Sequence, residues 1–211
     1  MGTIQDISAF LQKGRAKNVK ALVQQALDEN VDPKEILNEG LLAGMMIIGE
    51  KFKNNEVFVP EVLVAARALN AGLTILEPKL IEVGNEPVGK VVIGTVKGDL
   101  HDIGKNLVAM MLESSGFEVI DLGVDVPKEK FVEAYEANPD TKLICCSALL
   151  TTTMNAMKET VDLLNHSPFR DKIKVMVGGA PISQAFADEI GADAYTEDAA
   201  SCAQRAKELV A

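Results

Sequence analysis

Apolar residues in roughly the first 85 positions recur with helical spacing. One face of a helix is indicated by Val19, Leu22, Val23 and Leu27. Asp32-Pro33 is typical of a helix start, because aspartate can cap the first turn and proline fits within it. Asn54-Asn55 interrupts the long apolar face that follows, and Val59-Pro60 opens another helix. The pattern predicts a bundle of about four helices.

The pattern changes at residues 83–89, where two glycines and a proline indicate a linker between a unit 1–86 and a unit 87–211. Beyond it, short apolar runs alternate with amphipathic stretches. The runs predict strands at 91–96, 118–122, 143–149, 175–177 and 192–195. The stretches between and after them predict helices at 106–115, 128–137, 153–165, 182–190 and 199–210. This alternation predicts a doubly wound parallel sheet.

Polar residues gather in the loops that follow the predicted strands, and in such a sheet these loops share one ligand-binding edge. The three loops contain Gly98-Asp99-Leu100-His101-Asp102-Ile103-Gly104, then Ser147 to Thr153, then Gly178-Gly179-Ala180. Asp99 could hold one imidazole nitrogen of His101 and leave the other free for a metal. Gly104 would let the backbone approach a bulky ligand closely. These loops therefore predict a metal or cofactor site.

His101 lacks the partners that a protein-only metal site needs, since such sites use three or four ligands. The other histidine, His166, is expected at the opposite edge of the sheet. An axial ligand to a metal that brings its own equatorial ligands fits better, and haem and corrinoid are the candidates. A haem pocket is normally apolar and aromatic. The absence of Trp and the presence of two Tyr therefore disfavour haem.

Composition narrows the class of protein further. The net charge of −10 over 211 residues argues against nucleic acid as a partner. No apolar run reaches the roughly 18 residues that span a membrane, and the first residues lack a secretory pattern, so a cytoplasmic protein is expected. Cys145, Cys146 and Cys202 form no Cys-x-x-Cys pair and are expected to be buried thiols.

The motif Asp99-x-His101-x-x-Gly104, followed by Ser147-x-Leu149 and Gly178-Gly179, resembles the fingerprint of base-off, histidine-on cobalamin-binding domains. Residues 44–52 and 57–61 resemble the helical cap of cobalamin-dependent methionine synthase. The same cap occurs in the small corrinoid proteins of methanol, methylamine and methoxyarene methyltransferase systems. The resemblance covers essentially the whole chain. It implies a four-helix bundle cap followed by a flavodoxin-like (Rossmann-like) sheet of five parallel strands.

This resemblance also implies roles for individual residues. His101 would be the lower axial ligand to cobalt, Asp99 would accept a hydrogen bond from its far nitrogen, and Thr153 would complete the relay in place of a serine. Phe52 and Val59 would cover the upper face of the corrin, although Val59 stands where the family has leucine. The full set implied to bind cobalamin (methylcobalamin or a related corrinoid) is Gly98, Asp99, His101, Asp102, Ile103, Gly104, Ser147, Leu149, Thr151, Gly178, Gly179, Ala180, Phe52 and Val59.

The implied function is that of a methyl carrier, which is not catalytic alone. Its implied partners are a cognate methyl-donor methyltransferase, a second methyltransferase that passes the methyl to tetrahydrofolate or a thiol, and a reductive activator protein. The sequence leaves the methyl donor open, because similar carriers serve several donors and specificity resides in the partner enzyme. Three alternatives remain: the cobalamin-binding subunit of a radical isomerase, a cobalamin-dependent sensor, and a flavodoxin-like or receiver domain without corrinoid. The segment 44–61 argues against the first, and the helical unit leaves no room for the output module of the second.

Overall fold

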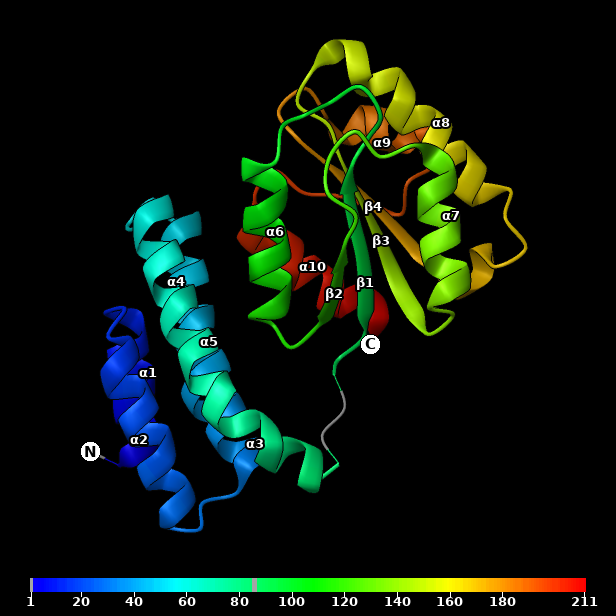
Figure 1. Cartoon of the computed structure of the whole chain (residues 1–211). Helices are drawn as coiled ribbons and strands as arrows, with labels where there is room; N and C mark the ends of the chain where they lie inside the picture. The colour runs from blue at the N-terminus through cyan, green and yellow to red at the C-terminus, as the bar shows by residue number, and fades with distance from the viewer. Residues whose placement is uncertain (1, 85–86) are drawn as a thin grey trace. The chain divides into compact units, whose positions relative to one another are not determined.

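A computed structural model describes residues 2–84 and 87–211 (Figure 1). The chain divides into two compact units, Met1–Glu86 and Pro87–Ala211. Within the predicted linker 83–89, Asn85 and Glu86 lie outside the described residues. The first unit is helical and the second is built on a parallel sheet, as the sequence pattern predicts.

The helical unit contains four helical segments, which confirms the predicted bundle. They are α1 (Thr3–Gln12), α2 (Ala16–Asp28), a continuous run of α3 (Pro33–Glu35), the π-helical η1 (Ile36–Leu42) and α4 (Ala43–Lys53), and finally α5 (Val59–Glu82). Asp32 caps the third segment, because its Oδ1 accepts the amide of Lys34 at 2.9 Å. Asn55 follows α4 in the left-handed region, with φ +58°, and ends that segment.

Helix α5 forms much of the core of this unit. It packs along α2 and buries Val62, Leu69 and Leu76. Its 24 residues and its mean hydropathy of 1.4 over 18 residues also make it long and apolar enough, by length and composition, to cross a membrane. The sequence analysis expected no apolar run of roughly 18 residues; α5 nevertheless reaches the average hydropathy of a spanning helix, because alanines between the leucines keep the average high without an unbroken apolar run. A core helix of a bundle meets the same criterion.

The second unit contains a five-stranded parallel sheet in the order β2-β1-β3-β4-β5. The strands are β1 (Lys90–Thr95), β2 (Glu118–Asp121), β3 (Thr141–Ser147), β4 (Lys174–Gly178) and β5 (Ala194–Tyr195). Strands β1, β3 and β4 read as continuous apolar runs because helices cover both faces of the sheet. The strand order reverses between β1 and β3, which places the ligand-binding crevice of such folds beside the ends of these two strands.

Helices cover the sheet from two sides (Figure 1). On one face α6 (Ile103–Glu113) packs against α10 (Ala199–Val210), and on the other lie α7 (Lys128–Ala137), α8 (Met154–Asn165) and α9 (Gln184–Ile190). Two short 3-10 turns, η2 (Thr151–Thr153) and η3 (Arg170–Lys172), flank α8. The three cysteines are buried and form no disulfide, as predicted. Burial raises the pKa of the Cys146 thiol to about 12.

Several element boundaries differ from the prediction at the ligand-binding edge, and two of them lie beside the loop after β1. Strand β3 ends at Ser147 instead of residue 149, because the amides of Leu149 and Leu150 donate to a side chain rather than to a neighbouring strand. Helix α6 begins at Ile103 instead of residue 106, since the Asn106 amide already donates to the Asp102 carbonyl at 2.7 Å. Both shifts bring polar backbone groups toward one loop, residues 96–102.

Candidate functional site

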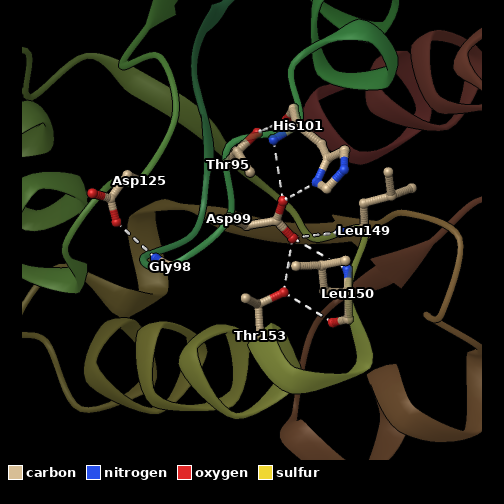
Figure 2. Close-up of polar contacts among 8 residues, drawn as sticks. All are labelled: Thr95, Gly98, Asp99, His101, Asp125, Leu149, Leu150 and Thr153. Atoms are coloured by element: carbon tan, nitrogen blue, oxygen red, sulfur yellow. Dashed lines mark hydrogen bonds and ion pairs between the residues drawn. The ribbon is translucent and has the colours of Figure 1, made fainter.

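The loop between β1 and α6 holds a histidine against a buried carboxylate. Asp99 is completely buried, and its Oδ1 lies 2.6 Å from Nδ1 of His101 and 3.1 Å from the His101 amide (Figure 2). An ionised carboxylate only accepts hydrogen bonds, so Nδ1 carries the ring proton. Nε2 is then the unprotonated nitrogen. The His101 side chain is 49% exposed, so this nitrogen is available to a ligand.

The second oxygen of Asp99 is held from the loop that follows β3. Oδ2 accepts the amides of Leu149 at 2.7 Å and Leu150 at 3.2 Å, and the hydroxyl of Thr153 at 2.8 Å (Figure 2). The Thr153 hydroxyl also lies 2.9 Å from the Leu150 carbonyl. Asp99 therefore joins the loops after β1 and β3, which lie on either side of the point where the strand order reverses.

These hydrogen bonds keep Asp99 ionised in spite of its burial. Burial by itself would raise the pKa of the carboxyl, because the charged form loses its hydration. The Leu149 amide, the His101 ring and the Thr153 hydroxyl stabilise the charged form, and together they hold the pKa of Asp99 well below its ordinary value. At neutral pH the carboxylate is therefore a permanent acceptor for Nδ1–H of His101.

Two further residues support this loop and were missed from the sequence. Thr95, at the end of β1, is fully buried and donates its hydroxyl to the His101 carbonyl at 2.9 Å. Asp125, in the loop after β2, accepts the Gly98 amide at 2.7 Å and donates its own amide to the Asp99 carbonyl at 2.9 Å. The rule that strand-end loops share one edge could have found Asp125, had it been applied to the second strand as well.

The residues predicted to bind the cofactor fall into three groups. In the first group, His101, Leu149 and Thr153 each form a hydrogen bond with the Asp99 carboxylate. Gly98, in the same loop as Asp99, donates its amide to Asp125. The remaining predicted residues of the sheet unit lie at the same sheet edge but form no hydrogen bond with the Asp99 carboxylate, and they are Asp102, Ile103, Gly104, Ser147, Thr151, Gly178, Gly179 and Ala180. Phe52 and Val59 belong to the helical unit, at the end of α4 and the start of α5.

The two adjacent glycines after β4 have different surroundings. Gly179 has φ +127°, and a Cβ there would lie 1.8 Å from the Ala148 carbonyl oxygen, so the packing of this loop on β3 already requires glycine. At Gly178 a Cβ would meet only the Thr196 carbonyl, at 3.7 Å. At Gly104, in the first turn of α6, a Cβ would have nothing within 4 Å. Gly104 and Gly178 therefore face open space that a ligand can enter.

Exposed apolar side chains surround the imidazole. Leu100 is 72% exposed and Ile103 78%, and Leu149 and Leu150 are also exposed. The described ranges, 2–84 and 87–211, contain no group of three or more His, Cys, Asp or Glu that could hold a bare metal ion. A metal at His101 therefore needs ligands from elsewhere. An exposed imidazole in loops that also carry exposed apolar side chains fits a broad macrocycle that brings its own metal, such as a corrinoid.

Comparisons with known proteins agree with this arrangement. Residues 89–203 match one family model described as a B12 binding domain, and residues 3–77 match a second with the same description. The chain is 45% identical to the dimethylamine corrinoid protein of Methanosarcina barkeri, over 99% of this chain and 97% of that protein. It is 43% identical to trimethylamine corrinoid protein 1 of Methanosarcina acetivorans, over 90% of this chain and 88% of that protein.

A solved structure gives the same result for the fold. The chain resembles a chain of the methanol:cobalamin methyltransferase complex from Methanosarcina barkeri, with a TM-score of 0.84 and 30% identity, over 99% of this chain and 79% of that chain. The two B12-binding family models match the helical unit and the sheet unit, and the relatives match this chain over nearly its whole length. The chain therefore belongs to the family of B12-binding corrinoid proteins.

Proposed function

We propose that this protein is the corrinoid methyl carrier of a methylamine methyltransferase system and that it binds cobalamin through His101. The observation that carries the proposal is the half-exposed imidazole whose Nδ1 is fixed by the buried Asp99. The methylamine class is supported by relatives named for dimethylamine and trimethylamine, which match this chain over nearly its whole length. The methyl donor, which the sequence left open, is thereby narrowed to a methylated amine.

Bound cobalamin supplies a cobalt centre that can accept and release a methyl group. The chain's own contribution begins at His101, whose Nε2 would bind the cobalt from below in place of the cofactor's own base. Asp99 keeps a ring proton on Nδ1, so in the neutral imidazole the lone pair lies on Nε2. A hydrogen bond from Nδ1–H to a carboxylate also makes the ligating nitrogen more basic. Thr153 and two backbone amides hold Asp99 in the orientation that this role requires.

The other predicted residues would position the rest of the cofactor. Gly104 and Ile103 would lie beneath the corrin ring. A Cβ at Gly104 would have nothing within 4 Å, and Ile103 offers an exposed apolar side chain. The displaced nucleotide tail would pass along the ends of β3 and β4, beside Ser147, Leu149, Thr151, Gly178, Gly179 and Ala180. Phe52 and Val59 of the helical unit would cover the upper face of the ring. Each of these assignments follows from the family resemblance at the matching position.

The partners follow from the carrier function. The chain of similar structure comes from a methanol:cobalamin methyltransferase complex, which supports a complex between this protein and its own methyl-donor methyltransferase. A second methyltransferase would pass the methyl group to a thiol or to tetrahydrofolate, and a reductive activator would restore the cofactor after oxidation. We place this protein and these partners in the cytoplasm.

Replacement of His101 by alanine tests the ligand assignment, and His166 provides a matched control because it is the chain's other histidine. Both variants and the wild type would be loaded with cobalamin, reduced to cobalt(II), and examined by visible and electron paramagnetic resonance spectroscopy. We expect the splitting from one axial nitrogen in the wild type and in His166→Ala, and its loss in His101→Ala. An unchanged spectrum in His101→Ala would contradict the assignment.

The donor is tested separately, with purified methyltransferases for monomethylamine, dimethylamine, trimethylamine and methanol. We expect methylation of the loaded protein with at least one amine and its enzyme, and none with methanol and its enzyme. Methylation by the methanol enzyme alone would overturn the methylamine class and leave the binding mode untouched.

A further inference from the structure

Asp125 brackets the segment that carries the buried carboxylate. Its Oδ1 accepts the Gly98 amide at 2.7 Å (Figure 2), while its own amide donates to the Asp99 carbonyl at 2.9 Å. The two bonds run in opposite directions and enclose Gly98 and Asp99 between them. A reciprocal pair of this kind restrains both the position and the tilt of the enclosed peptide. A single hydrogen bond would leave the peptide free to rotate about that bond.

The contact at Asp125 extends the association of β1 and β2 beyond the ends of both strands. The Thr95 amide donates to the Gly123 carbonyl at 3.0 Å, and the Val126 amide donates to the Thr95 carbonyl at 2.9 Å. Val96 and Val126 then form an isolated parallel bridge. Past this bridge the loop after β1 turns sharply at Gly98, which has φ +83°. Asp125 therefore acts where the regular backbone pairing has ended.

The backbone of Asp125 is itself in a conformation that most side chains avoid. Its φ is +53°, in the left-handed region, which aspartate and asparagine tolerate better than other non-glycine residues. Such conformations persist where surrounding contacts determine them. In this conformation the carboxylate and the amide of Asp125 both reach the same neighbouring loop, residues 96–102.

We propose that Asp125 is a positioning residue for the cobalt ligand, an inference that rests on the proposed binding of cobalamin through His101. The Asp99 carboxylate must meet donors from two separate segments, His101 on one side and Leu149 and Thr153 on the other. Hydrogen bonds weaken steeply when their donor angles become unfavourable, so the carboxylate must be held in one orientation to meet both sets of donors. Asp125 fixes the backbone of Asp99, and through it the direction in which Nε2 of His101 points.

Two substitutions separate the side-chain acceptor of Asp125 from its backbone conformation. Asp125→Gly keeps the left-handed conformation without strain and removes the acceptor, whereas Asp125→Asn keeps an acceptor oxygen and removes the charge. Asn30→Gly is the control, because Asn30 also has a left-handed φ, +58°, but lies in the helical unit. Each variant is compared with the wild type by thermal unfolding, by amide hydrogen exchange without cofactor, and by resonance spectroscopy of the cobalt(II)-loaded protein.

For Asp125→Gly we expect the Gly98 amide to exchange about tenfold faster, and the ratio of histidine-bound to histidine-free cobalt(II) to fall about tenfold, as expected for the loss of one hydrogen bond. For Asp125→Asn both changes should be smaller, about threefold, because a neutral acceptor forms a weaker bond than a charged one. Asn30→Gly should change neither quantity. If Asp125→Gly does not fold, Asp125→Asn carries the test alone.

The outcomes distinguish this inference from the proposed function. If the wild type shows the splitting of an axial nitrogen and both Asp125 variants keep the wild-type ratio, the positioning role is wrong, whether or not their thermal stability falls. If the wild type shows no nitrogen splitting, the proposed binding mode fails. In that case the ¹⁵N shifts of the His101 ring without cofactor decide whether Asp125 positions the imidazole: unchanged shifts in Asp125→Gly would overturn that role, and altered shifts would support it.

Discussion

Replacement of Asp99 by asparagine should change both the stability of the sheet unit and the position of a proton. Asp99 accepts five hydrogen bonds, two from the amide and ring of His101 and three from the amides of Leu149 and Leu150 and the hydroxyl of Thr153. Asparagine has the same shape but only one acceptor oxygen. Its oxygen should face the three donors of the second group, because that orientation satisfies the larger number.

The remaining NH2 group then faces His101. The NH2 group and the His101 backbone N–H are both donors, so no hydrogen bond forms between them. The backbone N–H is left without an acceptor, which lowers the free energy of unfolding by about 1–3 kcal/mol. The three retained bonds also lose the contribution of the charge, so the total destabilisation is about 3 kcal/mol, or about 10 °C in Tm for a domain of this size. In addition, Nδ1 must become an acceptor of the NH2 group. The ring proton therefore moves to Nε2, the nitrogen proposed to bind cobalt.

Both effects can be measured without cofactor. Thermal unfolding gives the change in stability, and the ¹⁵N shifts of the imidazole give the tautomer, which is readily assigned because the chain has only two histidines. Asp102→Asn is the matched control. Asp102 is exposed, and the hydrogen bond that it accepts from Asn106 is long and therefore weak, at 3.2 Å. An Asp99→Asn protein that keeps Nδ1–H and loses less than about 2 °C in Tm would refute this reasoning.

Four other predictions concern the same edge of the sheet. Thr153→Val should lower the free energy of unfolding in urea by about 1.5 kcal/mol, because Asp99 loses one donor and keeps its backbone donors, whereas Thr153→Ser should stay near wild type. The pKa of Asp99 is lower in the folded than in the unfolded chain, so its contribution to stability is complete above about pH 4 and is lost as the pH falls further. Urea unfolding at pH 6 and pH 3 should show this loss in the wild type and a smaller one in Asp99→Asn. Gly179→Ala should destabilise the protein by about 3 kcal/mol or more, because its Cβ would overlap the Ala148 carbonyl. Gly104→Ala should leave Tm unchanged or slightly higher and should weaken cobalamin binding in a titration, because its Cβ would enter open space.

The fold could be predicted from the sequence because its strands are uninterrupted apolar runs separated by helical stretches. Such runs occur only where both faces of a sheet are covered, so a single feature specified strand positions, parallel pairing and layers together. The pairing of Asp99 with His101 was also predictable, since they lie two positions apart within one loop. Thr153 followed from the rule that loops after parallel strands share an edge.

Residues whose environment depends on long-range packing could not be predicted in the same way. Lysine is normally exposed, yet Lys105 in α6 is buried, because it forms an ion pair with Asp121 at the end of β2 and donates to Asn106 at 2.6 Å. The left-handed backbone of Asp125 is equally invisible in the sequence, because aspartate adopts this conformation only where tertiary contacts favour it. The end of β3 was placed two residues late for the same reason, since the Asp99 carboxylate competes for its amides.

The donors that surround the buried carboxylate all belong to the polypeptide itself. None of these five bonds requires a bound ligand, so the chain's own groups can hold the His101 imidazole in one orientation, and a preorganised site loses less chain freedom on binding than one that folds around its ligand. With such a site, the proposed carrier could release a damaged cofactor and bind an intact one without refolding.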